Sequence, residues 1–329
     1  MKPLRVPYKE VNGVGIPLDI YTPDVKVKTA NGLSPVLIMI HGGGFVLGFS
    51  KMNNADQIED CLNRGWIVLC IEYRLCPGVN LLDGPICDVR DALRWVQARG
   101  LCQTLKDVSS PIYADLDRIM AMGASAGGHL ALSMAWGVER PPIAILDFYG
   151  PTNFNDQFWI QPIEEVRSKL PAVLPDSVFE PLYKQATVFI GGRSLEGQAD
   201  VETQSGPLQV SLDQRRREFA LQAVAEGRVL HSIWPAFPKH LDLVDPVLNI
   251  HPKWPPTAIV HGNCDYMVPI HLSKRFYSAL KAQNIETEFI EVEGEPHTFI
   301  GEMVKGSPTW DRQRKGFDFL EKIIKRSYV

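Results

Sequence analysis

The feature that most constrains this chain is a series of short apolar runs separated by stretches with helical periodicity. Each run is about as long as a strand, and its nearly continuous apolar character is typical of a strand covered on both faces of a parallel sheet. Strands that alternate with helices favour an open α/β sheet. The predicted strands are residues 36–40, 66–71, 118–122, 143–146, 256–260 and 288–292.

Helices are predicted between these strands, where apolar residues recur at helical spacing or where the segment is small and apolar throughout. A hairpin is predicted near the start of the chain, because Asn12-Gly13 separates two strand-like segments. The predicted helices are residues 83–96, 127–136, 270–282 and 312–324, and the hairpin strands are residues 6–11 and 14–21.

The alternation stops between about residues 150 and 250, where aromatic residues are interleaved with prolines and charges. We predict that residues 151–250 form a mainly helical insertion over the edge of the sheet, with residues 1–30 packing beside it. Residues 1–150 and 251–329 then form the core. The run Arg215-Arg216-Arg217 lies in the insertion and predicts a solvated helix face, with an anion site as the alternative.

Composition excludes several classes of function. The chain has 34 Lys plus Arg and 38 Asp plus Glu, a net charge of −4, so a non-specific nucleic-acid binder is not expected. The sequence lacks an apolar stretch of about 18–20 residues, which argues against stable membrane insertion. The first ten residues lack the apolar segment of a secretory signal, and the six cysteines form no C-x-x-C pair. We therefore expect free thiols and a cytoplasmic location.

The segment Gly123-Ala124-Ser125-Ala126-Gly127 follows a predicted strand and opens a predicted helix. This is the G-x-S-x-G arrangement in the setting that a nucleophilic serine requires. Such a serine sits on a sharp turn, and the residues two before and two after it must lack side chains because they crowd that turn. Gly123 and Gly127 meet this need. We predict that Ser125 is the nucleophile; the alternative is a glycine-rich turn with a bystander serine.

Three glycines follow the strand 36–40, in His41-Gly42-Gly43-Gly44-Phe45. Glycines allow the backbone to approach a ligand closely and to direct N–H groups at one point. In acyl transfer that point is the oxyanion of the tetrahedral intermediate. We predict an oxyanion hole made by the N–H groups of Gly43, Gly44 and Ala126, with His41 in a structural role. The alternative, a phosphate-binding turn, lacks the Lys-Ser/Thr or glycine spacing of known phosphate loops.

A catalytic serine needs a base, and the base needs an acid that orients it. His297 lies in a turn-rich loop after the last strand, and Asp265 lies in the loop after the preceding strand. The order Ser125, Asp265, His297 is the one expected when a G-x-S-x-G serine is followed by its partners. Other polar residues are assigned structural or solvated positions: His129 to packing, His261 to structural support, and Glu295 to solvent, with tuning of the base as the alternative for Glu295.

No metal or cofactor is expected. The sequence contains no H-E-x-x-H, no paired C-x-x-C and no carboxylate-rich loop. A dinucleotide fingerprint does not follow the first strand either.

These segments resemble the α/β-hydrolase superfamily, and within it the hormone-sensitive-lipase-like carboxylesterases. Residues 41–45 match that family's oxyanion signature, residues 72–77 resemble its Y-R-L-x-P segment, and residues 117–128 resemble its D-x-R-I…G-x-S-A-G-G block. Asp265 and His297 match its acid and base. The resemblance covers about residues 30–150 and 255–325. It implies an α/β-hydrolase fold: a mostly parallel central sheet flanked by helices, with a mainly helical cap insertion.

Two departures from that family bear on the substrate. Ala124 stands where the family usually has Asp or Glu, which predicts the loss of a supporting hydrogen bond near Ser125. Residues 265–269 resemble the D-x-x-V-P loop of peptidase-like and feruloyl-esterase-like hydrolases more than the acid loop of the lipase branch. Residues 73–95 are similar to fungal hydrolases, some of them associated with secondary metabolism.

The sequence thus predicts a serine hydrolase that cleaves a small-molecule carboxylic ester through an acyl-enzyme on Ser125. A lactone, a thioester or a peptide bond could be cleaved by the same triad, and these alternatives remain open. A non-catalytic ligand-binding protein is a third hypothesis, because plant gibberellin receptors are similar to this family. Such receptors lose the catalytic base, whereas His297 is present. The resemblance also leaves a homodimer open.

Overall fold

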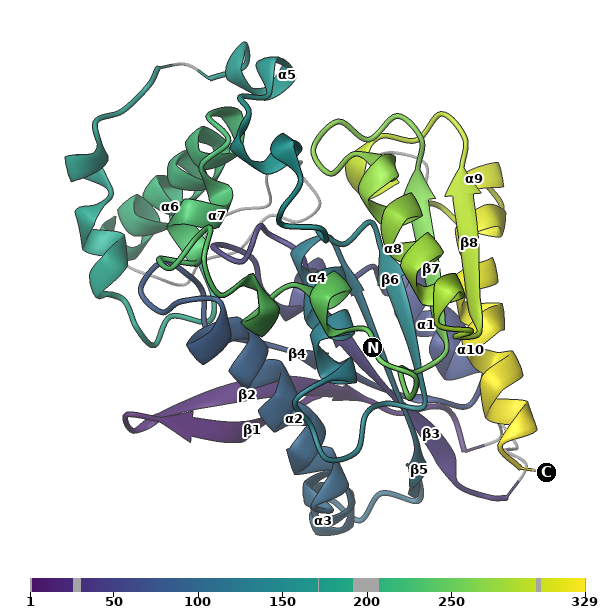
Figure 1. Cartoon of the computed structure of the whole chain (residues 1–329). Coiled ribbons are helices and arrows are strands. Elements are labelled where there is room, and N and C mark those ends of the chain that lie inside the picture. The colour runs from purple at the N-terminus through teal and green to yellow at the C-terminus, as the bar shows by residue number, and fades with distance from the viewer. Residues whose placement is uncertain (1, 26–30, 171, 192–206, 300–302, 329) are drawn as a thin grey trace.

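The computed structural model describes residues 2–25, 31–170, 172–191, 207–299 and 303–328, with residues 207–212 described as backbone only. At its centre is an eight-stranded sheet (Figure 1) in the order β1-β2-β4-β3-β5-β6-β7-β8. The strands are β1 (Leu4–Val11), β2 (Val14–Tyr21), β3 (Ser34–Ile40), β4 (Ile67–Ile71), β5 (Ala114–Ala124), β6 (Ala144–Phe148), β7 (Thr257–Gly262) and β8 (Thr287–Val292).

Most of the sheet is parallel. β4, β3, β5, β6, β7 and β8 pair in parallel, and β1 and β2 add an antiparallel hairpin at one edge. The predicted runs are therefore strands. As predicted, β3, β4, β6 and β7 are buried on both faces, whereas the edge strand β8 is only partly buried. The predicted α/β-hydrolase fold is confirmed in this topology.

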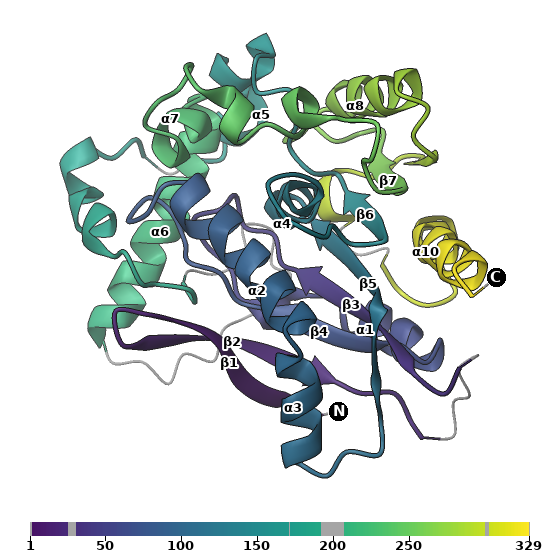
Figure 2. The ribbon, with the colours of Figure 1, turned by 60° about the horizontal axis from the view of Figure 1, so that its bottom comes forward.

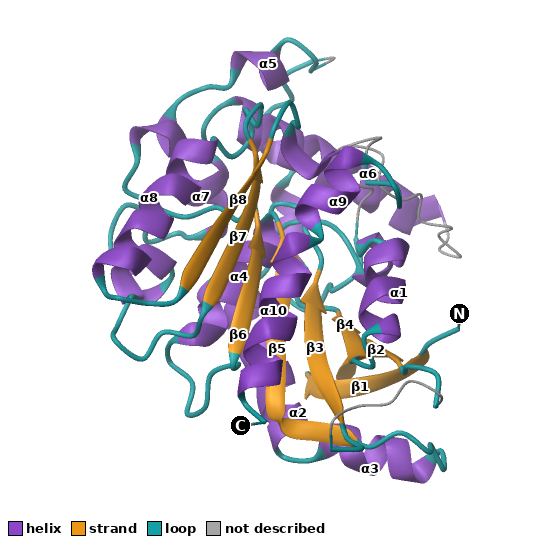
Figure 3. Ribbon diagram, turned by 90° about the vertical axis from the view of Figure 1, so that its right-hand side faces the viewer, coloured by secondary structure: helices purple, strands orange, loops and turns teal. Residues whose placement is uncertain are grey.

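Helices cover both faces of the sheet, as Figures 2 and 3 show from two sides. Successive residues of β3 point to opposite faces: Ile38 and Ile40 belong to one apolar core, and Leu37 and Met39 belong to the other. The first core is closed by α2 (Cys87–Gln97), α3 (Gly100–Asp107), α4 (Ala126–Leu132) and α8 (Ile270–Ala282). The second is closed by α1 (Ala55–Asn63) and α10 (Lys315–Arg326).

The loops that carry the predicted site residues leave the same edge of the sheet. β3 ends at Ile40, which pairs with Gly123 of β5, and β7 ends at Gly262, which pairs with Val292 of β8. Because these strands are parallel, their carboxyl ends lie together, and ligands of open α/β sheets bind outside such ends. The topology thus places three distant stretches of sequence at one rim.

The ends of the chain add one feature to the predicted fold and correct another. Residues 4–21 extend the sheet, because β2 pairs with β4, and β1 packs against α2. The predicted helix 312–324 is two helices, α9 (Pro308–Gln313) and α10, with Arg314 between them. The helix at 270–282 has the predicted bounds.

The interval 151–250 is described in part, and its regular structure there is helical. Only α6 (Pro207–Ala225) is long; α5 (Glu164–Arg167), α7 (Val229–Ile233) and five 3₁₀ helices have three to five residues each. In Figure 1, α5, α6 and α7 lie together at the upper left, above the hairpin of β1 and β2. Among the described residues, no helix has the length and apolar character needed to cross a bilayer.

Candidate active site

Ser125 sits at the turn between β5 and α4, in a backbone conformation that few residues adopt. Its φ is 55° and its ψ is −124°, a strained combination of the kind held in place at functional sites. A Cβ on Gly123 would lie 2.1 Å from the carbonyl oxygen of Gly127, and one on Gly127 would lie 2.2 Å from that of Ile40. Both positions therefore require glycine, for the steric reason inferred from the sequence.

The structure brings Ser125, His297 and Asp265 together. The Ser125 hydroxyl is 2.9 Å from His297 Nε2, and His297 Nδ1 is 2.6 Å from Asp265 Oδ2. This network assigns the Nδ1–H tautomer to His297: Nδ1–H donates to the carboxylate, and Nε2 accepts from the hydroxyl. The arrangement is that of a nucleophile, a general base and an orienting acid.

The carboxylate of Asp265 is fully engaged. Its Oδ1 accepts the N–H groups of Met267 and Val268, both at 2.9 Å. Its Oδ2 accepts from His297 and also lies 3.1 Å from Nε2 of His261. Burial alone would raise the pKa of Asp265, but the two histidines outweigh it and hold the pKa well below its usual range. Asp265 is thus an anion at any pH at which His297 can act as a base.

His261 is the second histidine on this carboxylate. Its side chain is fully buried, its Nε2 is also 2.8 Å from the carbonyl oxygen of Val268, and its Nδ1 is 2.8 Å from the Ser273 hydroxyl. A neutral ring that accepts from Ser273 at Nδ1 can donate Nε2–H to both oxygens. The sequence suggested a structural role for His261, and the structure shows that it supports the acid: the hydrogen-bonded series Ser273–His261–Asp265–His297–Ser125 is continuous.

The predicted oxyanion loop adopts conformations that favour glycine. Gly43 has φ +115° and Gly44 has φ +58°, and a Cβ on Gly43 would lie 2.0 Å from the carbonyl oxygen of Leu47. The Gly43 carbonyl accepts the N–H groups of Val46 and Leu47, at 3.1 and 3.0 Å. No described backbone acceptor takes the N–H of Gly43 or Gly44. Ala126 opens α4, where a helical N–H has no intrahelical partner. All three predicted donors line the cavity beside Ser125.

His41 lies beneath this loop and is buried, as its predicted structural role requires. Its ring stacks on Tyr73 with centroids 4.3 Å apart, and its Nδ1 is 2.7 Å from the carbonyl oxygen of Gly42. Burial lowers the pKa of His41 to about 4, so the ring is neutral at neutral pH. The Tyr73 hydroxyl donates to the carbonyl oxygen of His41 at 3.0 Å. The start of the oxyanion loop is thereby fixed to the segment that follows β4.

A cavity of about 520 Å³ opens beside Ser125. It has the size of a site for a small organic ligand, for which about 300–1,000 Å³ is usual. Part of its wall is aromatic or aliphatic and comes from the interval 151–250. Another part, around the start of α1, is polar. The first group is Phe154, Phe158, Trp159, Ile163, Val229 and Leu230; the second is Lys51, Asn53, Asn54 and Gln57.

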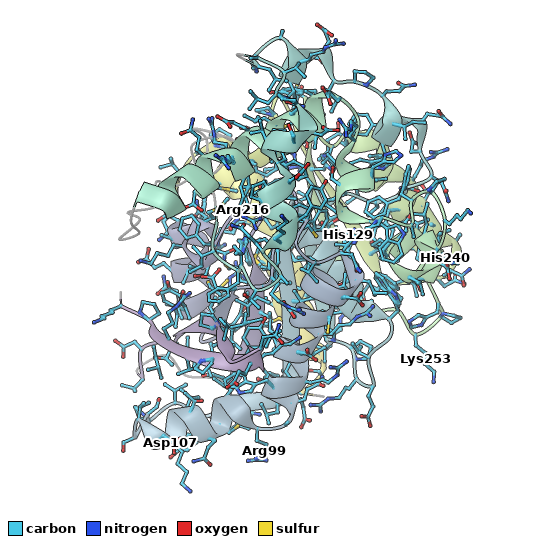
Figure 4. The ribbon with its side chains drawn as sticks, turned by 90° about the vertical axis from the view of Figure 1, so that its left-hand side faces the viewer. Arg99, Asp107, His129, Arg216, His240 and Lys253 are labelled. Atoms are coloured by element: carbon cyan, nitrogen blue, oxygen red, sulfur yellow. The ribbon has the colours of Figure 1, made fainter. Side chains whose placement is uncertain are left out.

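Two residues near the site are placed as follows. His129 (Figure 4) is buried between Phe45 and Phe154, stacked on the latter with centroids 5.0 Å apart, and its Nδ1 is 2.8 Å from the carbonyl oxygen of Pro151. This is the packing role predicted.

Glu295 was expected in solvent, and that expectation is wrong: it is buried and accepts from the Thr309 hydroxyl. Its backbone carbonyl accepts the N–H of Cys264, which ties the base loop to the acid loop.

Ala124 lines the cavity next to Ser125. An acidic side chain at this position, as the resembling family has, would occupy part of that space. The alanine at this position therefore leaves that part of the cavity open.

Among the described residues, the grouping with metal-ligand spacing is Cys87, Asp88 and Asp91. Lys9 Nζ lies within this group, 2.6 Å from Asp88 and 2.5 Å from Asp91. An ammonium ion pair already satisfies these carboxylates, and the group is remote in sequence from the triad. It is a structural ion pair, which links β1 to α2.

Comparison with known proteins places this chain in a family. A family profile described as BD-FAE matches residues 18–186, which include the oxyanion loop and Ser125. The chain belongs to the BD-FAE family. The superfamily inferred from the sequence agrees with this result, whereas the hormone-sensitive-lipase-like branch is a finer assignment that the profile does not carry.

The BD-FAE chain is also similar to parts of much longer fungal proteins. It is 31% identical to the non-reducing polyketide synthase Preu6 of Preussia isomera over 96% of its own length, and 30% identical to the non-reducing polyketide synthase ascC of Acremonium egyptiacum over 95%. It spans only 14% and 15% of those two proteins. The similarity to these synthases extends along almost the whole chain, beyond the residues 73–95 for which the sequence indicated a resemblance to fungal hydrolases.

Solved structures share the fold of this BD-FAE protein at low sequence identity. A protein of unknown function from Staphylococcus aureus superposes with a TM-score of 0.68, at 21% identity, covering 97% of this chain and 99% of that one. Thermogutta terrifontis esterase 2, with butyrate bound, superposes with a TM-score of 0.60, at 19% identity, covering 99% and 95%. These likenesses establish the fold.

Proposed function

We propose that this protein is a serine hydrolase that cleaves carboxylic esters through an acyl-enzyme on Ser125. The observation that carries the proposal is the hydrogen-bonded series Ser125–His297–Asp265, at 2.9 and 2.6 Å, beside a cavity of about 520 Å³. Membership of the BD-FAE family and the fold shared with an esterase support the same reaction class.

In the proposed mechanism, His297 Nε2 removes the proton from the Ser125 hydroxyl as its oxygen attacks the acyl carbon. The carbonyl oxygen takes up the negative charge and accepts the N–H groups of Gly43, Gly44 and Ala126. The imidazolium of His297 then protonates the leaving alcohol as the C–O bond breaks. Water repeats the sequence on the acyl-enzyme: it loses a proton to His297, releases the acid and regenerates the hydroxyl.

Asp265 acts by holding the His297 ring in one tautomer and stabilising the imidazolium that forms. Its low pKa keeps it charged throughout this cycle. We propose that residues 151–250 act as a cap, because they supply the aromatic and aliphatic part of the cavity wall. An ester with an aromatic or branched apolar part under Phe154, Phe158 and Trp159 fits this wall best.

The direct test is the hydrolysis of a p-nitrophenyl ester by the wild-type protein and by Ser125→Ala. We expect the variant to lose roughly 10⁶-fold in kcat, as serine-protease knockouts do. A fluorophosphonate should label Ser125 in the wild type and nothing in the variant, as read by mass spectrometry of the labelled peptide. Retention of most of the turnover by Ser125→Ala would mean that another group is the nucleophile.

A second candidate is the cleavage of a thioester. The similarity to non-reducing polyketide synthases over almost the whole chain favours it, because polyketide assembly joins acyl units that are activated as thioesters. The same triad serves both bonds, since only the leaving group differs. Matched aryl esters, aryl N-acetylcysteamine thioesters and lactones separate these candidates: a kcat/KM for the thioester at least tenfold above that for the ester would displace the first proposal.

A non-catalytic binding role is the third hypothesis, and its test is independent. If folded wild-type protein is not labelled by the fluorophosphonate and hydrolyses none of these substrates, the triad is not functional and the cavity is a binding site.

A further inference from the structure

The central arginine of the run Arg215-Arg216-Arg217 is buried. The sequence predicted that this run is a solvated face of its helix, α6, and for Arg217 this is right, because its side chain is exposed. Arg216 is only 1% exposed. Figure 4 shows it where α6 faces the rest of the molecule. A buried guanidinium needs hydrogen-bond acceptors around it, because desolvating a cation is costly.

The acceptors of Arg216 identify what it holds. Its Nη1 donates to the carbonyl oxygens of Val46 and Cys76, each at 2.8 Å, and its Nη2 donates to Gln185 Oε1 at 2.7 Å. Burial lowers the pKa of Arg216 to about 10, with Asp213 on the same helix acting in the opposite direction. The group therefore stays charged at neutral pH, and a charged donor makes stronger hydrogen bonds to carbonyls than a neutral one.

Val46 belongs to the turn that carries the predicted oxyanion donors. Its N–H donates to the carbonyl oxygen of Gly43 at 3.1 Å, and its own carbonyl accepts from Arg216. The N–H of Cys76 donates to the carbonyl oxygen of Phe45 at 2.9 Å, and the Cys76 carbonyl also accepts from Arg216. One guanidinium group thus joins the turn 43–46 to the segment after β4, because it donates to a backbone carbonyl of each.

A second contact joins the oxyanion loop to the interval 151–250. Gly48 and Gly191 exchange backbone hydrogen bonds, at 2.8 and 3.3 Å. The aliphatic part of Arg216 packs against Gly191, since a Cβ there would lie 2.9 Å from Arg216 Cδ. The interval 151–250 is therefore attached to the oxyanion loop through Gly191 and Arg216, in addition to forming a wall of the cavity.

We propose that Arg216 is a positioning residue for the oxyanion hole: it fixes the turn 43–46 so that the N–H groups of Gly43 and Gly44 face the acyl oxygen. This inference rests on the proposed function. Because catalytic hydrogen bonds depend on donors held in place before the reaction, a displacement of about 1 Å can cost 10²-fold in rate. Arg216 itself does not line the cavity, so its effect passes through the loop.

The test compares Arg216→Met with Arg216→Lys, and uses Arg217→Met as the matched control. Met keeps the apolar length of the side chain and removes the donors, whereas Lys keeps a cation that can donate to the two carbonyls without the planar fork. We expect Arg216→Met to lower kcat for a p-nitrophenyl ester by about 10- to 100-fold with KM little changed. Arg216→Lys should recover part of that loss, and Arg217→Met should equal the wild type.

The decisive readout is binding of an arylboronic acid, which forms a tetrahedral adduct on serine, against binding of the matching carboxylic acid product. Weaker oxyanion contacts should raise the inhibition constant of the boronic acid by about the factor lost in kcat, and leave that of the product unchanged. A purely structural role would not separate the two. Equal weakening of both ligands, or a raised KM at unchanged kcat, would overturn the inference.

Folding is checked by urea unfolding of each variant. If Arg216→Met does not fold, Arg216→Lys and Gln185→Leu carry the test, because Gln185→Leu removes one acceptor of the guanidinium and leaves its charge. Boronic acid affinity unchanged in both would overturn the inference. An inert wild-type protein that resists the fluorophosphonate would overturn the proposed function instead, and this inference with it.

Discussion

Two neighbouring glycines in the oxyanion loop allow a paired test, because the structure gives them different surroundings. A Cβ on Gly43 would lie 2.0 Å from the carbonyl oxygen of Leu47, at a φ of +115°. A Cβ on Gly44 would meet no atom within 4 Å, at a φ of +58°. Gly43→Ala and Gly44→Ala are therefore the same chemical change, one against backbone and one into open space.

The magnitudes follow from these contacts. For Gly44→Ala the cost is that of placing an alanine in the left-handed region, about 1–2 kcal/mol of stability, and the N–H remains in place. For Gly43→Ala, the new methyl group and the Leu47 carbonyl must move apart by roughly 1 Å or more to reach normal contact. That movement turns the Gly43 peptide, whose loss as a donor should cost about 2.7–4 kcal/mol of barrier.

The assay is kcat for p-nitrophenyl ester hydrolysis, with urea unfolding to report stability. We expect Gly43→Ala to lose about 10²–10³ in kcat, and Gly44→Ala to stay within about tenfold of the wild type, since its N–H is retained. If both variants fold and Gly43→Ala turns over as fast as Gly44→Ala, the N–H of Gly43 does not stabilise the transition state, and the predicted oxyanion hole is wrong.

Two further predictions concern buried groups. His261→Leu removes a donor to Asp265, so the carboxylate should hold the His297 imidazolium more strongly. The acidic limb of the kcat/KM profile should then move to higher pH, by about half to one unit. His261→Gln, whose amide can still donate, should move the limb less, and equal profiles for the wild type and both variants would argue against the contact. Burial raises the pKa of Asp147 to about 7, although the N–H that Gly150 donates to its carboxylate acts to lower it. Folded Asp147 therefore keeps a proton that the unfolded chain loses above pH 4, so the contribution of Asp147 to stability should fall by about 4 kcal/mol as pH rises from 4 to 7. In urea unfolding, the difference in stability between the wild type and Asp147→Asn should therefore change over this pH range, and a difference that is constant with pH would contradict the assignment.

The sequence was sufficient for the parts of the fold that depend on local pattern. Four strands of the parallel region, β3, β4, β6 and β7, have both faces buried, which leaves an uninterrupted apolar run such as residues 36–40. The edge strand β8 is only partly buried, and its run 288–292 includes two glutamates. The turn at Ser125 was predictable because steric crowding restricts Gly123 and Gly127 to glycine. The meeting of Ser125, Asp265 and His297 followed from the rule that parallel strands end at one edge.

What the sequence did not reveal depends on long-range pairing. A hairpin signal at Asn12-Gly13 fixes a turn but does not say which neighbour the hairpin joins, and the structure places it beside β4. Glu295 is a charged residue in a turn-rich loop, and only its contact with Thr309 explains its burial. Arg216 lies in a run of three arginines, where composition favours solvent; only the packing of α6 selects the middle residue as the buried one.

The two halves of the candidate site are supported by different parts of the chain. The acid and base are held from within the core, by His261, Ser273 and the backbone of the loop after β7. The oxyanion loop is held on one side by Tyr73 of the core and on the other by Arg216, which belongs to the interval 151–250. Loosening that interval should therefore reduce transition-state binding while leaving the Ser125–His297 pair intact. Fluorophosphonate labelling needs the Ser125–His297 pair, and negative charge develops on the phosphoryl oxygen during the reaction. In Arg216→Met, labelling should therefore become slower, while its pH dependence should not change. A change in that pH dependence would show that the interval acts on the base as well, and that the two supports are not separate.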